Sequence, residues 1–93
     1  MRVEKSVRIV NTEGLHARPS GALVSLAAAY ESELRISCGD REVDGRSILG
    51  LITLGATCGS ELRFLASGPD AEALVDDLVR LVEAGFPLDR TAK

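Results

Sequence analysis

Apolar and polar residues alternate in four segments of the chain, with the period of two that is typical of β-strands with one face on a core. The segments span residues 2–9, residues 33–38, a short stretch around Val43, and residues 61–67. Between the second and the third lies Gly39-Asp40, a two-residue turn of the kind that joins the strands of a hairpin. We therefore expect four strands, two of them paired as a hairpin.

Two other segments carry apolar residues at the three- and four-residue spacing of an amphipathic helix. The first spans 17–29, and Pro19 stands in its first turn, where the missing N–H costs nothing. The second is the last helix, which we expect Asp70 to cap and Gly85 to end. Its apolar stripe consists of Leu74, Val75, Leu78, Leu81 and Val82.

A shorter apolar stretch, residues 48–54, follows Ser47, which can cap a helix, and precedes a glycine, which can end one. Its apolar residues fall on more than one side, so a helix this small leaves some of them exposed. We interpret Ile48, Leu51 and Ile52 as a docking patch for a partner protein. The alternative is that all three belong to the core.

The elements follow one another in the order β-α-β-β-α-β-α. Strands that each have one wet face predict an α+β open-faced β-sandwich, in which three helices cover one face of a four-stranded antiparallel sheet. A chain of 93 residues is long enough for one compact domain and too short for two separate cores. We expect a single domain over residues 1–88 and a short loose tail over residues 89–93.

Composition and charge exclude several classes of function. No window approaches the roughly 18 uninterrupted apolar residues of a transmembrane helix, and charges stand where a signal peptide would have its apolar segment. A net charge of −3, the lack of a Lys/Arg cluster and a count of only three aromatic residues argue against nucleic-acid binding. We expect a cytoplasmic protein that neither inserts into a membrane nor binds nucleic acid, and whose partners are proteins.

The two cysteines give no sign of a metal site. Cys38 and Cys58 lack CxxC spacing, and with a single histidine in the chain there are too few ligands for a structural zinc ion. We expect two reduced, partly buried thiols, joined in a disulfide only if the fold brings them close. No metal or other cofactor is expected.

His16, the only histidine, stands at the start of the first helix. The first N–H groups of a helix lack internal partners and sit at the positive end of its dipole, so they attract a phosphate group. Arg18 adds a planar cation with several donors. A neutral imidazole can attack phosphorus without an accessory base, which makes His16 a candidate phosphoryl acceptor. The alternatives are a metal ligand and a helix-capping histidine without chemistry.

Two motifs at matching spacing carry a resemblance to a known family. GLHARP followed by a helix, and RSILGLITLG further on, resemble the histidine-containing phosphocarrier family HPr of the phosphoenolpyruvate-dependent phosphotransferase system. The resemblance covers nearly the whole chain, and the family has the order of elements given above. It implies the HPr-like open-faced sandwich and a carrier protein rather than an enzyme.

The resemblance also implies roles for individual residues. His16 would be phosphorylated by enzyme I and would pass the phosphoryl group to IIA-type proteins. Arg18 would contact the phosphoryl group, and Pro19 would shape the loop. Ser47 would be the target of an HPr kinase/phosphorylase in bacteria that have one. We expect a monomer.

Some features differ from the commonest members of the family. No Lys or Arg occurs from Pro19 to Leu34, where members often present basic residues, and the ending EAGF resembles the nitrogen-related paralogues. The sequence leaves open a sugar-transport or a nitrogen-related branch. Two other classes also stay open, a regulatory binding module controlled at Ser47 and a small-molecule sensor on a ferredoxin-like scaffold.

Overall fold

The computed structural model describes residues 1–87, so the expected tail at residues 89–93 lies outside the described part. Within residues 1–87 the chain forms four strands and three helices in the predicted order. In chain order they are β1 (Arg2–Arg8), α1 (Ala17–Ala27), β2 (Glu33–Cys38), β3 (Arg41–Asp44), α2 (Ile48–Thr53), β4 (Glu61–Ser67) and α3 (Ala71–Glu83).

The strands form one sheet in the order β1-β4-β2-β3, and every neighbouring pair is antiparallel. The register places Val7 opposite Leu62 and Ile36 opposite Phe64, so buried side chains face one another across the strands. This alternation is the one that the sequence predicts. The predicted open-faced sandwich is therefore confirmed.

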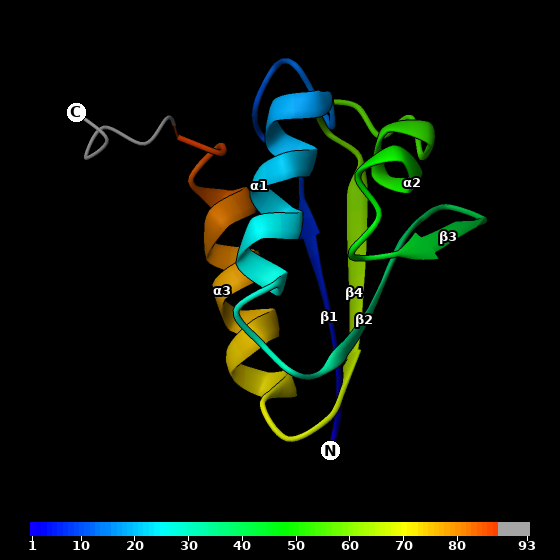
Figure 1. Cartoon of the computed structure of the whole chain (residues 1–93). Coiled ribbons are helices and arrows are strands. Elements are labelled where there is room, and N and C mark those ends of the chain that lie inside the picture. The colour runs from blue at the N-terminus through cyan, green and yellow to red at the C-terminus, as the bar shows by residue number, and fades with distance from the viewer. Residues whose placement is uncertain (88–93) are drawn as a thin grey trace.

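The core lies between the sheet and the helices (Figure 1). Leu62 and Phe64 of β4 are fully buried, and they face Leu74 and Leu78 on the apolar stripe of α3 across one continuous core cluster. In Figure 1, α1 and α3 lie side by side along the sheet, and α2 lies beside the N-terminal part of α1. Both α1 and α2 are therefore positioned by the same core.

The last helix is not capped in the way the sequence predicts. Asp70 occupies the N-cap position, but its side chain makes no capping hydrogen bond. The carboxylate instead accepts hydrogen bonds from the Ser32 hydroxyl and from the backbone N–H groups of Glu31 and Ser32. These bonds, with that from Ser32 first, lower the pKa of Asp70 below its usual range. The prediction of a side-chain cap is wrong, because Asp70 ties the segment before β2 to the start of α3.

The C-terminus of α1 is held by an arginine from a distant part of the chain. The helix ends at Ala27, two residues earlier than expected, and the N–H groups of Ala29 and Tyr30 donate to the carbonyls of its last turn. The Arg46 guanidinium donates to the carbonyls of Ala27, Tyr30 and Ser32 at 2.8–3.0 Å. Since Arg46 directly precedes Ser47, these bonds tie the end of α1 to the start of α2.

The two cysteines are separate and unpaired. Cys38 is half-buried at the end of β2, whereas Cys58 is exposed in the turn between α2 and β4. The expectation that both thiols are partly buried is therefore wrong for Cys58.

Candidate functional site

The loop that precedes α1 is fixed by the buried side chain of Asn11. Its amide nitrogen donates to the carbonyl of Gly14 and to the carboxylate of Glu13, both at 3.0 Å. The Leu15 N–H donates to the carbonyl of Ala56 at 3.0 Å. The loop is thereby held against the segment that follows α2.

Gly14 is required at the point of closest approach. Its φ of +70° lies in the left-handed region, and a Cβ atom there would stand 2.6 Å from the Ala56 carbonyl oxygen. Position 14, two residues before His16, must therefore be a glycine.

His16 is the exposed N-cap residue of α1, and its side chain makes no capping hydrogen bond. The Ser20 N–H makes the first bond of the helix, to the His16 carbonyl at 3.0 Å. Among residues 1–87, the N–H groups of Ala17 and Arg18 have no hydrogen-bond acceptor. The buried Pro19 that follows them has no backbone N–H. His16 thus lies beside two free donors at the positive end of a helix dipole, as the sequence predicts.

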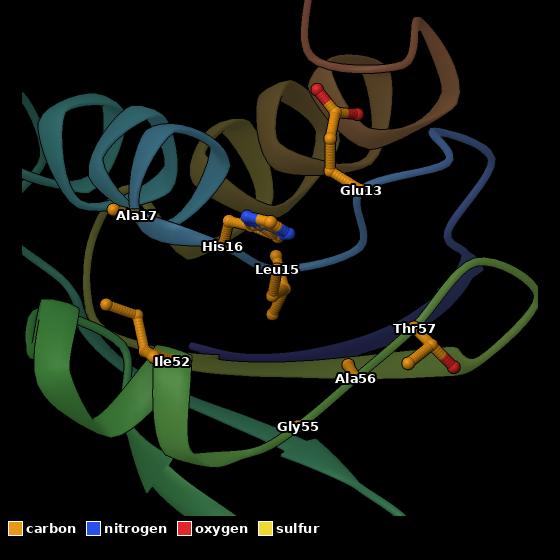
Figure 2. A pocket seen from close by; sticks show the side chains of 8 residues that line it. All are labelled: Glu13, Leu15, His16, Ala17, Ile52, Gly55, Ala56 and Thr57. Atoms are coloured by element: carbon orange, nitrogen blue, oxygen red, sulfur yellow. The ribbon is translucent and has the colours of Figure 1, made fainter.

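An open cavity of about 440 Å³ lies in front of His16. Its lining comes from Glu13, from residues 15–17, from Ile52 of α2 and from residues 55–57. Figure 2 shows Glu13 and His16 on one side of the cavity, with Ile52 and Thr57 on the other. The imidazole is therefore reachable from outside the molecule.

Glu13 is a site residue that the sequence reasoning missed. Its carboxylate accepts from Asn11 at 3.0 Å and pairs with Arg18 at 3.1 Å. The hydrogen bond from Asn11, reinforced by the backbone N–H of Glu13 and by Arg18, lowers the pKa of Glu13 to about 2. The signal for this ion pair in the sequence is weak. Glu13 and Arg18 are five residues apart, and Glu13 lies before the helix that contains Arg18.

Arg18 lies at the site, but its guanidinium is engaged elsewhere. Besides Glu13, it donates to the carbonyl of Phe86 at 2.8 Å. Phe86 is buried in the turn after α3 and has a φ of +53°. Arg18 therefore joins the loop before α1 to the turn that follows α3.

The apolar face of α2 differs from the predicted docking patch. Leu51 is 0% exposed and belongs to the core, so its assignment to the patch is wrong. Ile48 is 43% exposed, Ile52 is 39% exposed, and Leu49, which the prediction omitted, is 71% exposed. Helical spacing contains this signal, because residues 48, 49 and 52 share one face while residue 51 points to the other. We call Ile48, Leu49 and Ile52 the α2 face.

Ser47 caps α2, as predicted. Its hydroxyl oxygen accepts from the N–H of Gly50 at 2.9 Å, and the residue is half-buried. A cap of this kind does not prevent the hydroxyl from being modified, since the oxygen acts only as an acceptor.

Residues 1–87 gather no group of three or more side chains of the types that ligate metals. None of the helices formed by these residues is long and apolar enough to cross a lipid bilayer.

Comparisons with known proteins agree with one another. Residues 3–84 match the family model described as "PTS HPr component phosphorylation site". The chain is 36% identical over 84 residues to phosphocarrier protein HPr of Treponema pallidum, covering 90% of this chain and 96% of that protein. It is also 36% identical over 85 residues to phosphocarrier protein NPr of Shewanella violacea, covering 91% and 93% respectively.

A solved structure gives the same result. The crystal structure of HPr-C-His from Thermoanaerobacter tengcongensis superimposes with a TM-score of 0.87 at 32% identity, covering 94% of this chain and 98% of that one. The matches therefore extend over nearly all of the described chain.

The close approach at Gly14 can be tested by urea unfolding of Gly14→Ala, with Gly39→Ala as the matched control. Both glycines have a left-handed φ, but open space surrounds Gly39. Each substitution costs about 1–2 kcal/mol for its φ, and overpacking against Ala56 adds about 1–3 kcal/mol at Gly14 only. Equal losses of unfolding free energy in the two variants would show that the contact with Ala56 does not constrain the loop.

Proposed function

Because the chain belongs to the HPr family of phosphocarrier proteins, we propose that His16 accepts a phosphoryl group from phosphorylated enzyme I and passes it to IIA-type proteins. The observation that supports this role best is the exposed imidazole at the start of α1, beside the free N–H groups of Ala17 and Arg18. Those donors favour a dianion at that position.

The transfer needs only positioning and charge stabilisation. A lone pair of a neutral His16 ring nitrogen attacks the phosphorus, and the bond between the phosphorus and the donor atom breaks as the new bond forms. The donor atom keeps the electron pair, so no oxidant or reductant takes part. On the product, the negative oxygens would meet the N–H groups of α1 and the Arg18 guanidinium, and Pro19 would keep the helix start in shape.

The first test is phosphorylation by phosphoenolpyruvate and a cognate enzyme I. We expect one phosphate per chain, labile in acid and stable in base, and we expect His16→Ala to remove it while melting like the wild type, because His16 is exposed. Intact-mass measurement before and after acid treatment reports both results. An alanine variant that still gains this phosphate would show that another residue is the acceptor.

We assign docking of enzyme I and the IIA-type proteins to the α2 face. Ile52 lines the cavity in front of His16. Leu49, on the same face of α2, is more exposed than Ile52. An exposed apolar face that adjoins a reactive group suits transient protein contacts, because burying it drives association without a fixed pocket. The partners are cytoplasmic proteins on this proposal, and the carrier itself acts as a monomer.

Leu49→Glu tests the α2 face, and Leu65→Glu, at a half-buried position on the outer face of the sheet, serves as the control. We expect Leu49→Glu to weaken enzyme I binding about tenfold, the loss of an interface residue of ordinary weight. The unfolding free energy should change by no more than about 0.5 kcal/mol, since Leu49 is exposed. Isothermal titration and melting curves measure the two quantities. Unchanged binding by Leu49→Glu, or equal weakening by Leu65→Glu, would remove the α2 face from the docking surface.

We further propose that Ser47 is a regulatory phosphorylation site for an HPr kinase/phosphorylase. Ser47 directly precedes Ile48 of the α2 face, so a charge there would have to be desolvated when a partner docks. The same charge would stabilise the start of α2, because it meets the positive end of the helix dipole. Docking would therefore be weakened without a loss of folding.

Ser47→Asp tests this regulation, and Ser47→Asn provides an uncharged residue that also caps helices well. We expect Ser47→Asp to melt at or slightly above the wild-type temperature, given a dipole contribution of about 0.3–1 kcal/mol. It should accept phosphate from enzyme I more slowly, chiefly through weaker binding, while Ser47→Asn behaves like the wild type. Transfer rates that are equal in the Asp variant and the wild type, over a range of protein concentrations, would leave Ser47 as a helix cap only.

A nitrogen-related or other regulatory branch is the second candidate, and the surface of α1 favours it. Beyond Arg18, α1 has no Lys or Arg to attract acidic sugar-transport partners. Adjacent genes would separate the branches, since a sugar permease beside enzyme I indicates transport and a IIA-type protein without a permease indicates regulation.

A further inference from the structure

Both arms of the Arg18 guanidinium have acceptors other than His16. One nitrogen donates to the carbonyl of Phe86 at 2.8 Å, and another pairs with a carboxylate oxygen of Glu13 at 3.1 Å. A phosphoryl group on His16 would be a third acceptor, and it would carry more charge than either of the other two. These two contacts use two of the five N–H donors of Arg18, so the phosphoryl group would share the guanidinium with Glu13 and Phe86 and would pull it away from them.

Glu13 is well placed to retain Arg18. Asn11 donates to the other oxygen of the Glu13 carboxylate at 3.0 Å, so the carboxylate is held from two sides. It stays ionised at neutral pH, because its pKa is about 2. Glu13 also lines the cavity in front of His16, on the same side as the imidazole (Figure 2).

We propose that Glu13 is a positioning residue that competes with the phosphoryl group on His16 for Arg18, and that it thereby makes the phosphoryl group easier to pass on. The inference rests on the proposed phosphorylation of His16. A carrier must accept phosphate and also release it, so a group that limits the stabilisation of the phosphorylated form favours release.

The size of the effect follows from the exposure of the ion pair. The Arg18 and Glu13 side chains are 41% and 43% exposed, and exposed pairs of this kind contribute little because water screens them. The competition should therefore change the phosphoryl-transfer equilibrium by about two- to fivefold. An effect of that size adjusts the carrier without preventing either step.

Glu13→Gln removes the charge and keeps an oxygen that can accept from Asn11. We expect the equilibrium between phosphorylated enzyme I and this protein to shift about two- to fivefold toward phosphorylated His16. The onward transfer to a IIA-type acceptor should become less favourable by the same factor. Quench-flow and intact-mass measurements give both constants. Glu33→Gln, at the start of β2 beyond the far end of α1, removes one charge elsewhere and should leave both unchanged.

Two further variants separate competition for Arg18 from other roles of Glu13. In the Arg18→Ala background, Glu13→Gln should have no effect on the equilibrium, because the contested side chain is gone. Glu13→Asp keeps the charge and should restore an equilibrium close to that of the wild type, whereas a role of side-chain length in the fold would make Asp behave worse than Gln.

The outcomes distinguish this inference from the function on which it rests. If wild type takes up no phosphate on His16, the proposed function fails and the role of Glu13 fails with it. If wild type is phosphorylated but Glu13→Gln has the same equilibrium constant, only the inference is overturned. The inference is also overturned if Glu13→Gln shifts the equilibrium by the same factor in the Arg18→Ala background. Glu13 would then act by repelling the phosphoryl group directly and not through Arg18.

Discussion

Gly14 lies so close to the carbonyl of Ala56 that no side chain fits between them. The N–H group of Leu15 donates a hydrogen bond to the same carbonyl, so two successive residues of the loop contact Ala56. Because Ala56 follows α2 and Leu15 precedes α1, this one backbone contact brings the beginning of one helix to the end of the other. The cavity in front of His16 is lined from both sides of that contact, by Leu15 and by Ala56, with Ile52 in its wall.

The second helix combines two tasks in six residues. Leu51 faces inward and joins the core, and Leu49 faces outward with two isoleucine neighbours. Nucleating so short a helix in isolation is unfavourable. Ser47 satisfies one free N–H at its start, and Arg46 anchors that start to the end of α1. The exposed apolar residues therefore lie on a fixed surface rather than on a fluctuating loop.

Local patterns in the sequence predicted the strands, the helices, the Ser47 cap and the position of His16, because each depends on residues a few positions apart. The cap at Asp70 was predicted wrongly, since its carboxylate bonds to Ser32, which is 38 positions away. The contact of Arg18 with Phe86 spans 68 positions and leaves no trace in any short window. Leu51 is a different case. The helical period places it on another face than residues 48, 49 and 52, so its burial could have been predicted from the sequence.

One set of bonds that fixes the fold, between Asp70 and Ser32, lies at the opposite end of the molecule from the groups proposed for chemistry. Asp70 and Ser32 meet where α1 ends and α3 begins, whereas His16 lies at the start of α1 (Figure 1). Changes at sites this far apart contribute to the free energy almost independently. Substitutions of exposed side chains near His16, such as Leu49, can therefore change the surface offered to other proteins without weakening the bonds between Asp70 and Ser32.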